Sequence, residues 1–112
     1  MLKDETIARV VKFRDDRNWR QFHTPKDLAL SMALEAAELL EVFQWSGADL
    51  ECREKADRIR EELADVLSYC ILMADVCGLD LDEIMNAKVD KNEVKYPAEK
   101  AWGSAAKYTE LT

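Results

Sequence analysis

The stretch that determines the fold is residues 24–45, whose sequence is TPKDLALSMALEAAELLEVFQW. Thr24 suits the N-cap of a helix, Pro25 suits its first position, and Asp27 has the spacing of a capping box. Because a Ser-Gly pair follows Trp45, we expect the helix to end at about that residue. Apolar residues occur on most sides of the helix, which predicts that it is surrounded by protein.

Two further helices are predicted on either side of this stretch. Apolar residues at helical spacing indicate the first over about residues 5–17. The other begins around residues 50–53 and ends at Cys77, where Gly78 provides a C-terminal cap. Residues 18–23 are polar and aromatic without a regular period, so we expect a loop there.

The C-terminal third contains one more predicted helix and an irregular arm. Asp80 and Glu83 have capping-box spacing, so the helix begins there. It should end before Tyr96, because a residue that precedes proline is disfavoured in helical conformation. Residues 97–112 lack a strong period and are predicted to form an extended arm. The sequence therefore predicts an all-α, four-helix bundle in a single domain, residues 1–112.

The composition of the chain excludes several classes of function before any motif is considered. The chain has 16 Lys and Arg against 23 Asp and Glu, which gives a formal net charge of −7. An acidic chain lacks the clustered basic surface that a nucleic-acid polymer requires, so we exclude that partner. The N-terminus lacks the apolar core of a signal peptide, and residues 63–77 are too short and polar to span a membrane. Three cysteines without metal-binding spacing indicate a reducing, cytoplasmic location.

The predicted helices have more apolar surface than one small chain can bury. A bundle of 112 residues cannot bury two helices that are apolar on most sides. Association with a second copy would cover them, so we expect a homo-oligomer.

The main chemical feature is a pair of carboxylate motifs on consecutive helices. Glu35 and Glu38 are three residues apart in the helix of residues 24–45. Glu62 and Asp65 have the same spacing in the next helix. Each pair projects from one helix face among apolar neighbours, and buried carboxylates need compensation. If the two helices pack antiparallel, the four carboxyl groups converge and require a cation.

The donor atoms indicate which metal this is. They are hard oxygen ligands without a nearby His or Cys, which favours Mg²⁺, with Mn²⁺ as a substitute. A di-iron site needs a Glu-x-x-His motif on two helices, whereas the single histidine, His23, lies in another segment. Metals held in this way complete their shell with water and substrate phosphates, which indicates phosphoryl or nucleotidyl chemistry. One such Glu pair is usually only solvated, but two in apolar sequence favour a metal.

Aromatic residues near the ends of the helix of residues 24–45 form a second candidate site. The cluster consists of Trp19, Phe22, His23 and Trp45, whose rings could stack on a nucleobase while the imidazole hydrogen-bonds to its edge. The alternative is an ordinary aromatic cluster at a helix end, and the two interpretations have about equal support.

A basic stripe forms the third candidate. Lys88, Asn92 and Lys95 recur on one face of the fourth helix, where they could clamp a triphosphate. The alternative is a solvated face near a helix C-terminus, where cations are favourable in any case.

These motifs resemble the MazG-like nucleoside triphosphate pyrophosphohydrolases. Glu-x-x-Glu followed by Glu-x-x-Asp, on two helices of a small all-α chain, is typical of that family. Residues 17–23 (RNWRQFH), 43–45 (FQW), 88–97 and 103–109 (GSAAKYT) resemble its dCTP pyrophosphatase branch. The resemblance covers nearly the whole chain in order.

The resemblance implies a helical homo-oligomer, a dimer or a tetramer, whose active site is lined by more than one chain. It implies Mg²⁺-dependent cleavage between the α and β phosphates of a dNTP, with dCTP or a modified dCTP as the expected substrate. The products are a nucleoside monophosphate and pyrophosphate, and the role is sanitation of the nucleotide pool. Two alternatives remain open, namely the same chemistry on a broad or non-canonical NTP set and a non-catalytic nucleotide-binding helical module.

The resemblance also implies roles for individual residues. The metal-binding and catalytic carboxylates would be Glu35, Glu38, Glu62 and Asp65. The base would be held by Trp19, His23 and Trp45, with Tyr69 near the sugar. The phosphates would be contacted by Lys88, Asn92, Lys95 and Tyr96. Two positions depart from the family pattern: Leu34 replaces an extra Glu of some members, and Lys95 replaces an expected Arg with a point charge.

Overall fold

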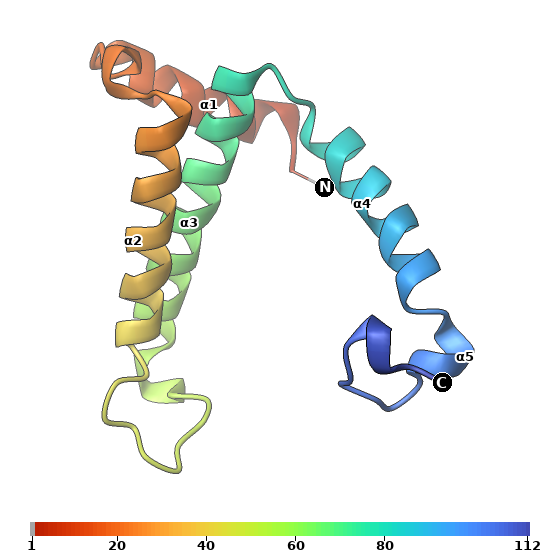
Figure 1. Ribbon diagram of the computed structural model, residues 1–112. Helices are drawn as coiled ribbons and strands as arrows, with labels where there is room; N and C mark the ends of the chain where they lie inside the picture. Colours follow the sequence, from red (N-terminus) through yellow and green to blue (C-terminus); the bar gives the residue numbers. More distant parts are fainter. Residues whose placement is uncertain (1) are drawn as a thin grey trace. The chain divides into compact units, whose positions relative to one another are not determined.

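The computed structural model describes residues 2–112, in which helices, turns and loops occur and no strand is present (Figure 1). The predicted all-α class is confirmed. The chain divides into two compact units, one ending at Leu79 and the other beginning at Asp80. Each unit is described by itself. No helix within residues 2–112 has the length and apolarity needed to cross a membrane.

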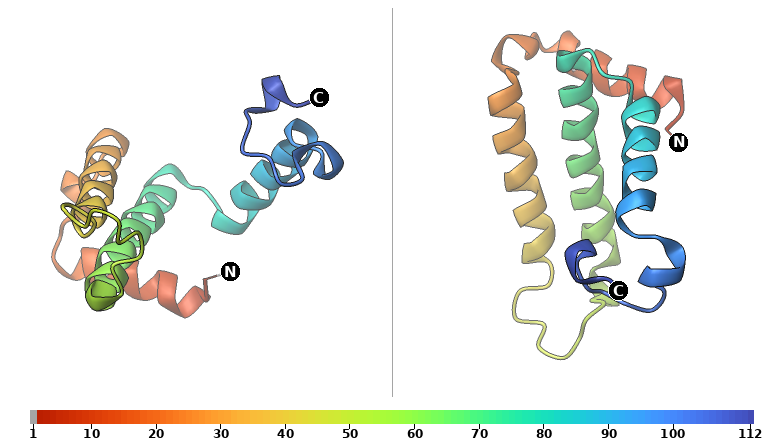
Figure 2. Two further views of the ribbon diagram at one scale, coloured as in Figure 1. Left: turned by 90° about the horizontal axis from the view of Figure 1, so that it is seen from below. Right: turned by 45° about the vertical axis from the view of Figure 1, so that its right-hand side comes forward.

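The first unit consists of an antiparallel helical hairpin and a crossing helix. Its elements are α1 (Asp4–Asp16), η1 (Arg20–Phe22), α2 (Pro25–Glu41), η2 (Arg53–Lys55) and α3 (Ala56–Cys77). Figures 1 and 2 show α2 and α3 side by side in opposite directions, with α1 lying across the end where α2 begins and α3 ends. This antiparallel arrangement is the one in which the four carboxyl groups were expected to converge.

The helix caps follow from the sequence. Thr24 Oγ1 accepts a hydrogen bond from the backbone N–H of Asp27 at 3.1 Å. Asp80 Oδ1 accepts one from the backbone N–H of Glu83 at 3.0 Å. Gly78 ends α3 with φ 66°, a left-handed conformation that favours glycine. The three predicted caps are confirmed.

Helix α2 ends at Glu41, four residues before the end that the sequence predicted. The chain then tightens into turns, because the N–H groups of residues 42–44 bond to carbonyls three residues earlier. Trp45 has a positive φ of 64°, which is incompatible with a continuing α-helix. The predicted helix end at Trp45 therefore lies in a turn.

Helix α3 begins at Ala56, later than the predicted start within residues 50–53. Asp49 Oδ1 accepts the backbone N–H groups of Glu51 and Cys52, at 3.2 and 3.1 Å. Cys52 has φ 46°, so the side-chain-stabilised turn and the short η2 precede the regular helix.

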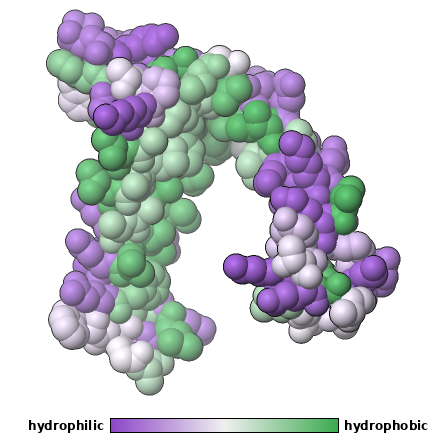
Figure 3. All heavy atoms as spheres, in the orientation of Figure 1, coloured by the Kyte–Doolittle hydropathy of each residue, from purple (hydrophilic) through white to green (hydrophobic). Residues whose placement is uncertain are grey.

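The hydrophobic core of the first unit lies among its three helices and the turn after α2. The buried apolar residues are Leu28, Val42, Cys52, Ile71, Leu72 and Ala74. Other apolar residues of α2 are not covered, since Leu34 and Leu40 are 66% and 71% exposed. In Figure 3, apolar side chains extend along the visible face of the α2–α3 hairpin. One chain therefore leaves much of the apolar surface of α2 open.

The second unit contains α4 (Leu81–Lys95), α5 (Ala98–Ala101) and η3 (Tyr108–Glu110). The short α5 lies in the arm that was predicted to be extended, so residues 2–112 contain a fifth α-helix in addition to the four predicted. It forms because the carbonyl of Pro97 accepts the N–H groups of Lys100 and Ala101, both at 2.9 Å. The rings of Tyr96 and Tyr108 meet edge to face at 5.9 Å. No residue of this unit is buried.

Candidate active site

Four carboxylates converge between α2 and α3. Glu35 and Glu38 come from α2, and Glu62 and Asp65 come from α3. One carboxylate oxygen from each of the four residues lies within 4.8 Å of the others. The i, i+3 spacing places each pair on one face of its helix, and the packing of the hairpin brings the two faces together. The antiparallel hairpin thus assembles an acidic cluster from two motifs far apart in sequence.

The carboxylates of the acidic cluster repel one another, and the charge of Arg58 offsets only part of the resulting rise in the pKa of Glu62. The Oε2 atoms of Glu35 and Glu62 are buried and have no hydrogen-bond partner there. Burial, followed by the neighbouring Glu38, raises the pKa of Glu35 to about 7. The same causes raise the pKa of Glu62 above its ordinary value. A cation would remove both the repulsion and the unsatisfied oxygens.

The donor set fits a hard divalent cation. All four groups offer carboxylate oxygens, which are the ligands that Mg²⁺ and Mn²⁺ prefer. The cluster lacks the imidazole and thiolate ligands that favour Zn²⁺ or copper. The two orphaned oxygens are the observation that supports this fit, because a solvated acidic surface would leave neither of them buried.

A cavity of about 440 Å³ lies against the acidic cluster. Asp65 belongs to both, and Tyr69 lines the cavity one turn further along α3. The opposite side is formed by Phe13, Trp19 and His23. A cavity of this size falls in the range of small-molecule sites. The structure therefore brings Trp19, His23 and Tyr69 together beside the carboxylates.

The aromatic wall of the cavity is a packed pair of rings. Phe13 and Trp19 meet edge to face with ring centres 5.7 Å apart. The guanidinium of Arg17 stacks over Phe13 at 3.7 Å from the ring centre. Sequence reasoning did not include Phe13 among the site residues. The sequence shows that Phe13 precedes Arg17 by four residues, the spacing of a contact along one helix. Whether Phe13 lines the cavity depends on how α1 crosses α3.

His23 presents a neutral imidazole to this site. Burial and, after it, the charge of Arg14 lower the pKa of His23. Its Nδ1 atom is buried and lacks a hydrogen-bond partner in the described part of the chain. A neutral imidazole has one donor and one acceptor nitrogen, so His23 can hydrogen-bond to a polar edge of a ligand.

Trp45 is not part of the same cavity. It follows the C-terminal end of α2, whereas Trp19 and His23 precede the N-terminal end. The 17 residues of α2 separate these ends by about 25 Å. Trp45 is 92% exposed. The structure therefore does not bring the three residues together within one chain.

The predicted phosphate-binding residues all lie in the second unit. Lys88 and Asn92 are exposed on α4. Lys95 places its Nζ atom 5.1 Å from the ring centre of Tyr108, and Tyr96 contacts the same ring. Lys95 and Tyr96 are therefore held locally by the arm.

Comparison with known proteins identifies relatives of this chain. The model of the MazG-like family matches residues 30–111. The chain is 40% identical to dCTP pyrophosphatase 1 of Mus musculus over 115 residues, covering 96% of this chain and 66% of that protein. The corresponding human protein is 42% identical over 115 residues with the same coverage. The chain thus spans 66% of the length of these curated relatives.

A solved structure shares the fold. It is a pyrophosphatase from Archaeoglobus fulgidus, 42% identical to this chain, with a TM-score of 0.78. The match covers 84% of this chain and 91% of that one.

Proposed function

The chain belongs to the MazG-like family, and on that premise we propose that it is a Mg²⁺-dependent nucleoside triphosphate pyrophosphohydrolase. Its substrate would be dCTP or a modified dCTP, which reacts with water to give the nucleoside monophosphate and pyrophosphate. The observation that carries this proposal is the acidic cluster with its two buried, unpartnered oxygens beside an aromatic-walled cavity. The names of the mouse, human and archaeal relatives support it.

The acidic cluster would hold the metal through Glu35, Glu38, Glu62 and Asp65. Bound Mg²⁺ supplies neutralisation of phosphate charge and a lowered pKa for bound water. An acidic protein with a formal net charge of −7 needs such a cation to bind a triphosphate. One of the four carboxylates would orient or deprotonate the attacking water.

The cavity would hold the nucleoside. Trp19 offers a ring face for base stacking, supported from the side by Phe13. His23 would hydrogen-bond to the base edge, because its Nδ1 lacks a partner in residues 2–112. Tyr69, on the α3 side, would lie near the sugar.

The remaining predicted contacts support an active site shared between copies of the chain. Trp45 follows the end of α2 that lies about 25 Å along the helix from Trp19 and His23, so it would join them at the base only in another copy. The phosphates would be contacted by Lys88, Asn92, Lys95 and Tyr96. The open apolar face of α2, which includes Leu34 and Leu40, supports a homo-oligomer, a dimer or a tetramer.

Charge and cysteine chemistry support the remaining parts of the proposal. The acidic net charge argues against a nucleic-acid polymer as partner. A reducing, cytoplasmic location is proposed because Cys52, Cys70 and Cys77 lack metal-binding spacing and cannot all pair within one chain.

The same chemistry on a broad or non-canonical NTP set is the second candidate function. The observation that favours it is the aromatic wall, because a stacked base is accepted whatever its identity. The edge contact of His23 alone would then have to discriminate between bases.

A turnover panel tests the proposal. Purified protein is incubated with each canonical dNTP and NTP and with 5-methyl-dCTP, in Mg²⁺ or in EDTA, and products are separated by chromatography. We expect dCMP and pyrophosphate in Mg²⁺ only. Glu38→Gln should abolish turnover. Glu41→Gln, an exposed Glu of the same helix outside the acidic cluster, should leave it unchanged.

The other outcomes separate the alternatives. Formation of dCDP and orthophosphate would contradict the cleavage position. Equal turnover of many nucleotides would favour the broad substrate set. Nucleotide binding without any turnover would favour a non-catalytic binding module.

A further inference from the structure

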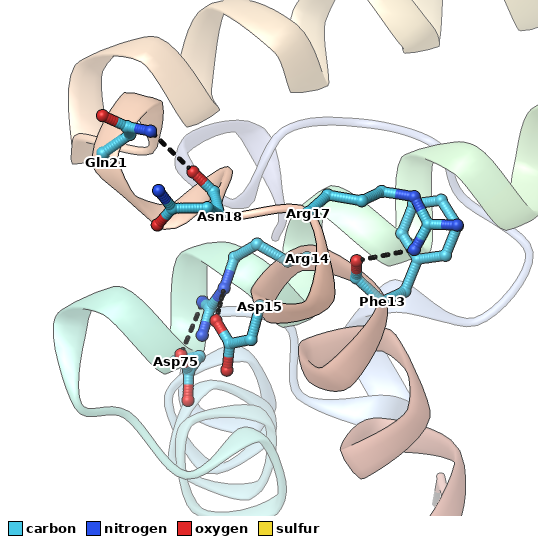
Figure 4. Close-up of polar contacts among 7 residues, drawn as sticks. All are labelled: Phe13, Arg14, Asp15, Arg17, Asn18, Gln21 and Asp75. Atoms are coloured by element: carbon cyan, nitrogen blue, oxygen red, sulfur yellow. Dashed lines mark hydrogen bonds and ion pairs between the residues drawn. The ribbon is translucent and has the colours of Figure 1, made fainter.

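Arg14 stands out among the described residues as a buried charge. Its side chain is 3% exposed, and no other charged residue within residues 2–112 is buried. Nη1 donates to Asp75 Oδ2 at 2.7 Å, and Nε donates to Asp15 Oδ1 at 2.9 Å (Figure 4). Arg14 belongs to the last turn of α1 and Asp75 to the last turn of α3. The pair therefore ties the ends of these helices together.

Stability alone does not account for a buried arginine at this position. Removing a guanidinium from water is costly, and apolar residues of similar volume often replace a buried ion pair without loss of stability. What a directional pair provides over an apolar contact is a defined register between α1 and α3. The role of the ion pair therefore depends on which part of the molecule requires a fixed register between α1 and α3.

The segment that follows Arg14 carries the aromatic wall. The carbonyl of Arg14 accepts the N–H of Trp19 at 3.1 Å. Asn18 has φ 54° and donates its N–H to the carbonyl of Asp15 at 3.0 Å, which reverses the chain. Gln21 Nε2 bonds to the carbonyl of Asn18 at 2.9 Å (Figure 4). The backbone position of Trp19 is thus set directly by the end of α1.

The cavity also connects the two ends of the ion pair. Arg14 lines the cavity together with Trp19 and His23. On α3 the cavity is lined by Asp65, Tyr69 and Leu72, and Asp75 follows Leu72 at the same helical spacing. The Arg14–Asp75 pair therefore lies where the wall from α1 meets the wall from α3. The charge of Arg14 also contributes, after burial, to lowering the pKa of His23.

We propose that Arg14 is a positioning residue, which through Asp75 holds the segment carrying Trp19 and His23 against α3 so that the nucleobase side of the cavity is preformed. The inference rests on the proposed function, since it assumes that this wall binds the base. Arg14 acts through Trp19 and His23 and takes no part in the acidic cluster.

The expected kinetic effect is on substrate binding. In Arg14→Met the ion pair that holds the aromatic wall against α3 is lost. The KM for the nucleotide should therefore rise about tenfold, as expected for a lost charged hydrogen bond. The kcat at saturating substrate should stay within about twofold, because the carboxylates are untouched. Asp75→Asn keeps one oxygen acceptor and should give a smaller rise in KM. Arg14→Lys should restore part of the loss.

A spectroscopic measurement tests the placement of the wall without turnover. In ¹⁵N-labelled protein, the indole N–H resonance of Trp19 is identified as the one absent in Trp19→Phe. It should shift or broaden in Arg14→Met and recover partly in Arg14→Lys. Arg14→Met and Asp75→Asn combined should change KM no more than Arg14→Met alone, because both remove one pair.

The matched control is the exposed ion pair between Lys12 and Asp16 on the same helix. Asp16→Asn should leave KM and the Trp19 resonance unchanged. The proposal is overturned if Arg14→Met lowers only the melting temperature, or if KM rises without any change in the Trp19 resonance. If the wild-type protein turns over no nucleotide, the proposed function fails, whereas the Trp19 resonance still decides the role of Arg14.

Discussion

The two units of the molecule differ in what they can do alone. The unit that ends at Leu79 has a buried core, an acidic cluster and a cavity. The unit that begins at Asp80 has regular helix and local ring contacts, but no buried residue. The first unit therefore carries its candidate chemistry on a scaffold of its own.

The second unit shows that a helix can be well capped and still lack a hydrophobic core. The α4 helix has a confirmed N-cap, yet its apolar residues Ile84, Met85 and Val89 remain substantially exposed. Isolated helices of about 15 residues are only marginally stable in water. The second unit by itself therefore provides α4 with no hydrophobic core.

The largest expected effect separates function from stability within the first unit. Glu62→Gln should lower kcat/KM at least about 1000-fold, because the proposed metal loses a charged ligand. In EDTA the same variant should have a higher melting temperature, since one repelling carboxylate is gone. Glu61→Gln, its exposed neighbour, should change neither quantity. A loss of stability in EDTA would show that Glu62 is not under repulsion.

The next prediction compares the cores of the two units. Leu28→Ala should lower the free energy of unfolding by about 2–5 kcal/mol, because Leu28 is fully buried in the first unit. Ile84→Ala in α4 should cost only about 0.5 kcal/mol, as for a surface position. Urea unfolding of dilute protein measures both free energies. A similar cost for Ile84 would mean that α4 shares a hydrophobic core.

A pH dependence is expected from the acidic cluster. The pKa of Glu35 is about 7 in the folded, metal-free protein, above its ordinary value of 4.5. The folded state thus holds this proton more tightly, so the stabilisation is present below pH 4.5 and is lost as the pH rises to about 7. Melting in EDTA should show this decline.

Two variants isolate the source of that decline. Glu35→Gln should flatten it, whereas Glu41→Gln, which lies outside the acidic cluster, should not. Stability that rises between these pH values, or a decline unaffected by Glu35→Gln, would contradict the assignment.

The smallest effect concerns the two confirmed N-caps. Thr24→Ala should cost about 1 kcal/mol of global stability, because α2 belongs to the core of the first unit. Asp80→Ala removes an equivalent cap but should mainly increase hydrogen exchange in the first turn of α4. Urea unfolding and amide exchange of both variants measure the contrast. Equal losses of global stability would show that the two units unfold together.

Local chemistry allowed much of this fold to be predicted from the sequence. Capping pairs, a left-handed glycine and helical spacing depend on neighbouring residues, so the caps at Thr24, Gly78 and Asp80 were predictable. The ends near Trp45 and Cys52 were not, because positive φ values at non-glycine residues are set by competing turns.

For the candidate site, the sequence by itself determined which carboxylates share a helix face, because i, i+3 spacing is a property of the helix. It also determined the acidic charge that calls for a cation. Only the tertiary structure decided that Phe13 and Arg14 border the cavity and that Trp45 lies at the far end of α2 from it. The crossing of α1 over α3 has no local sequence pattern, since it involves contacts between residues far apart in sequence, such as Arg14 and Asp75, which are 61 residues apart.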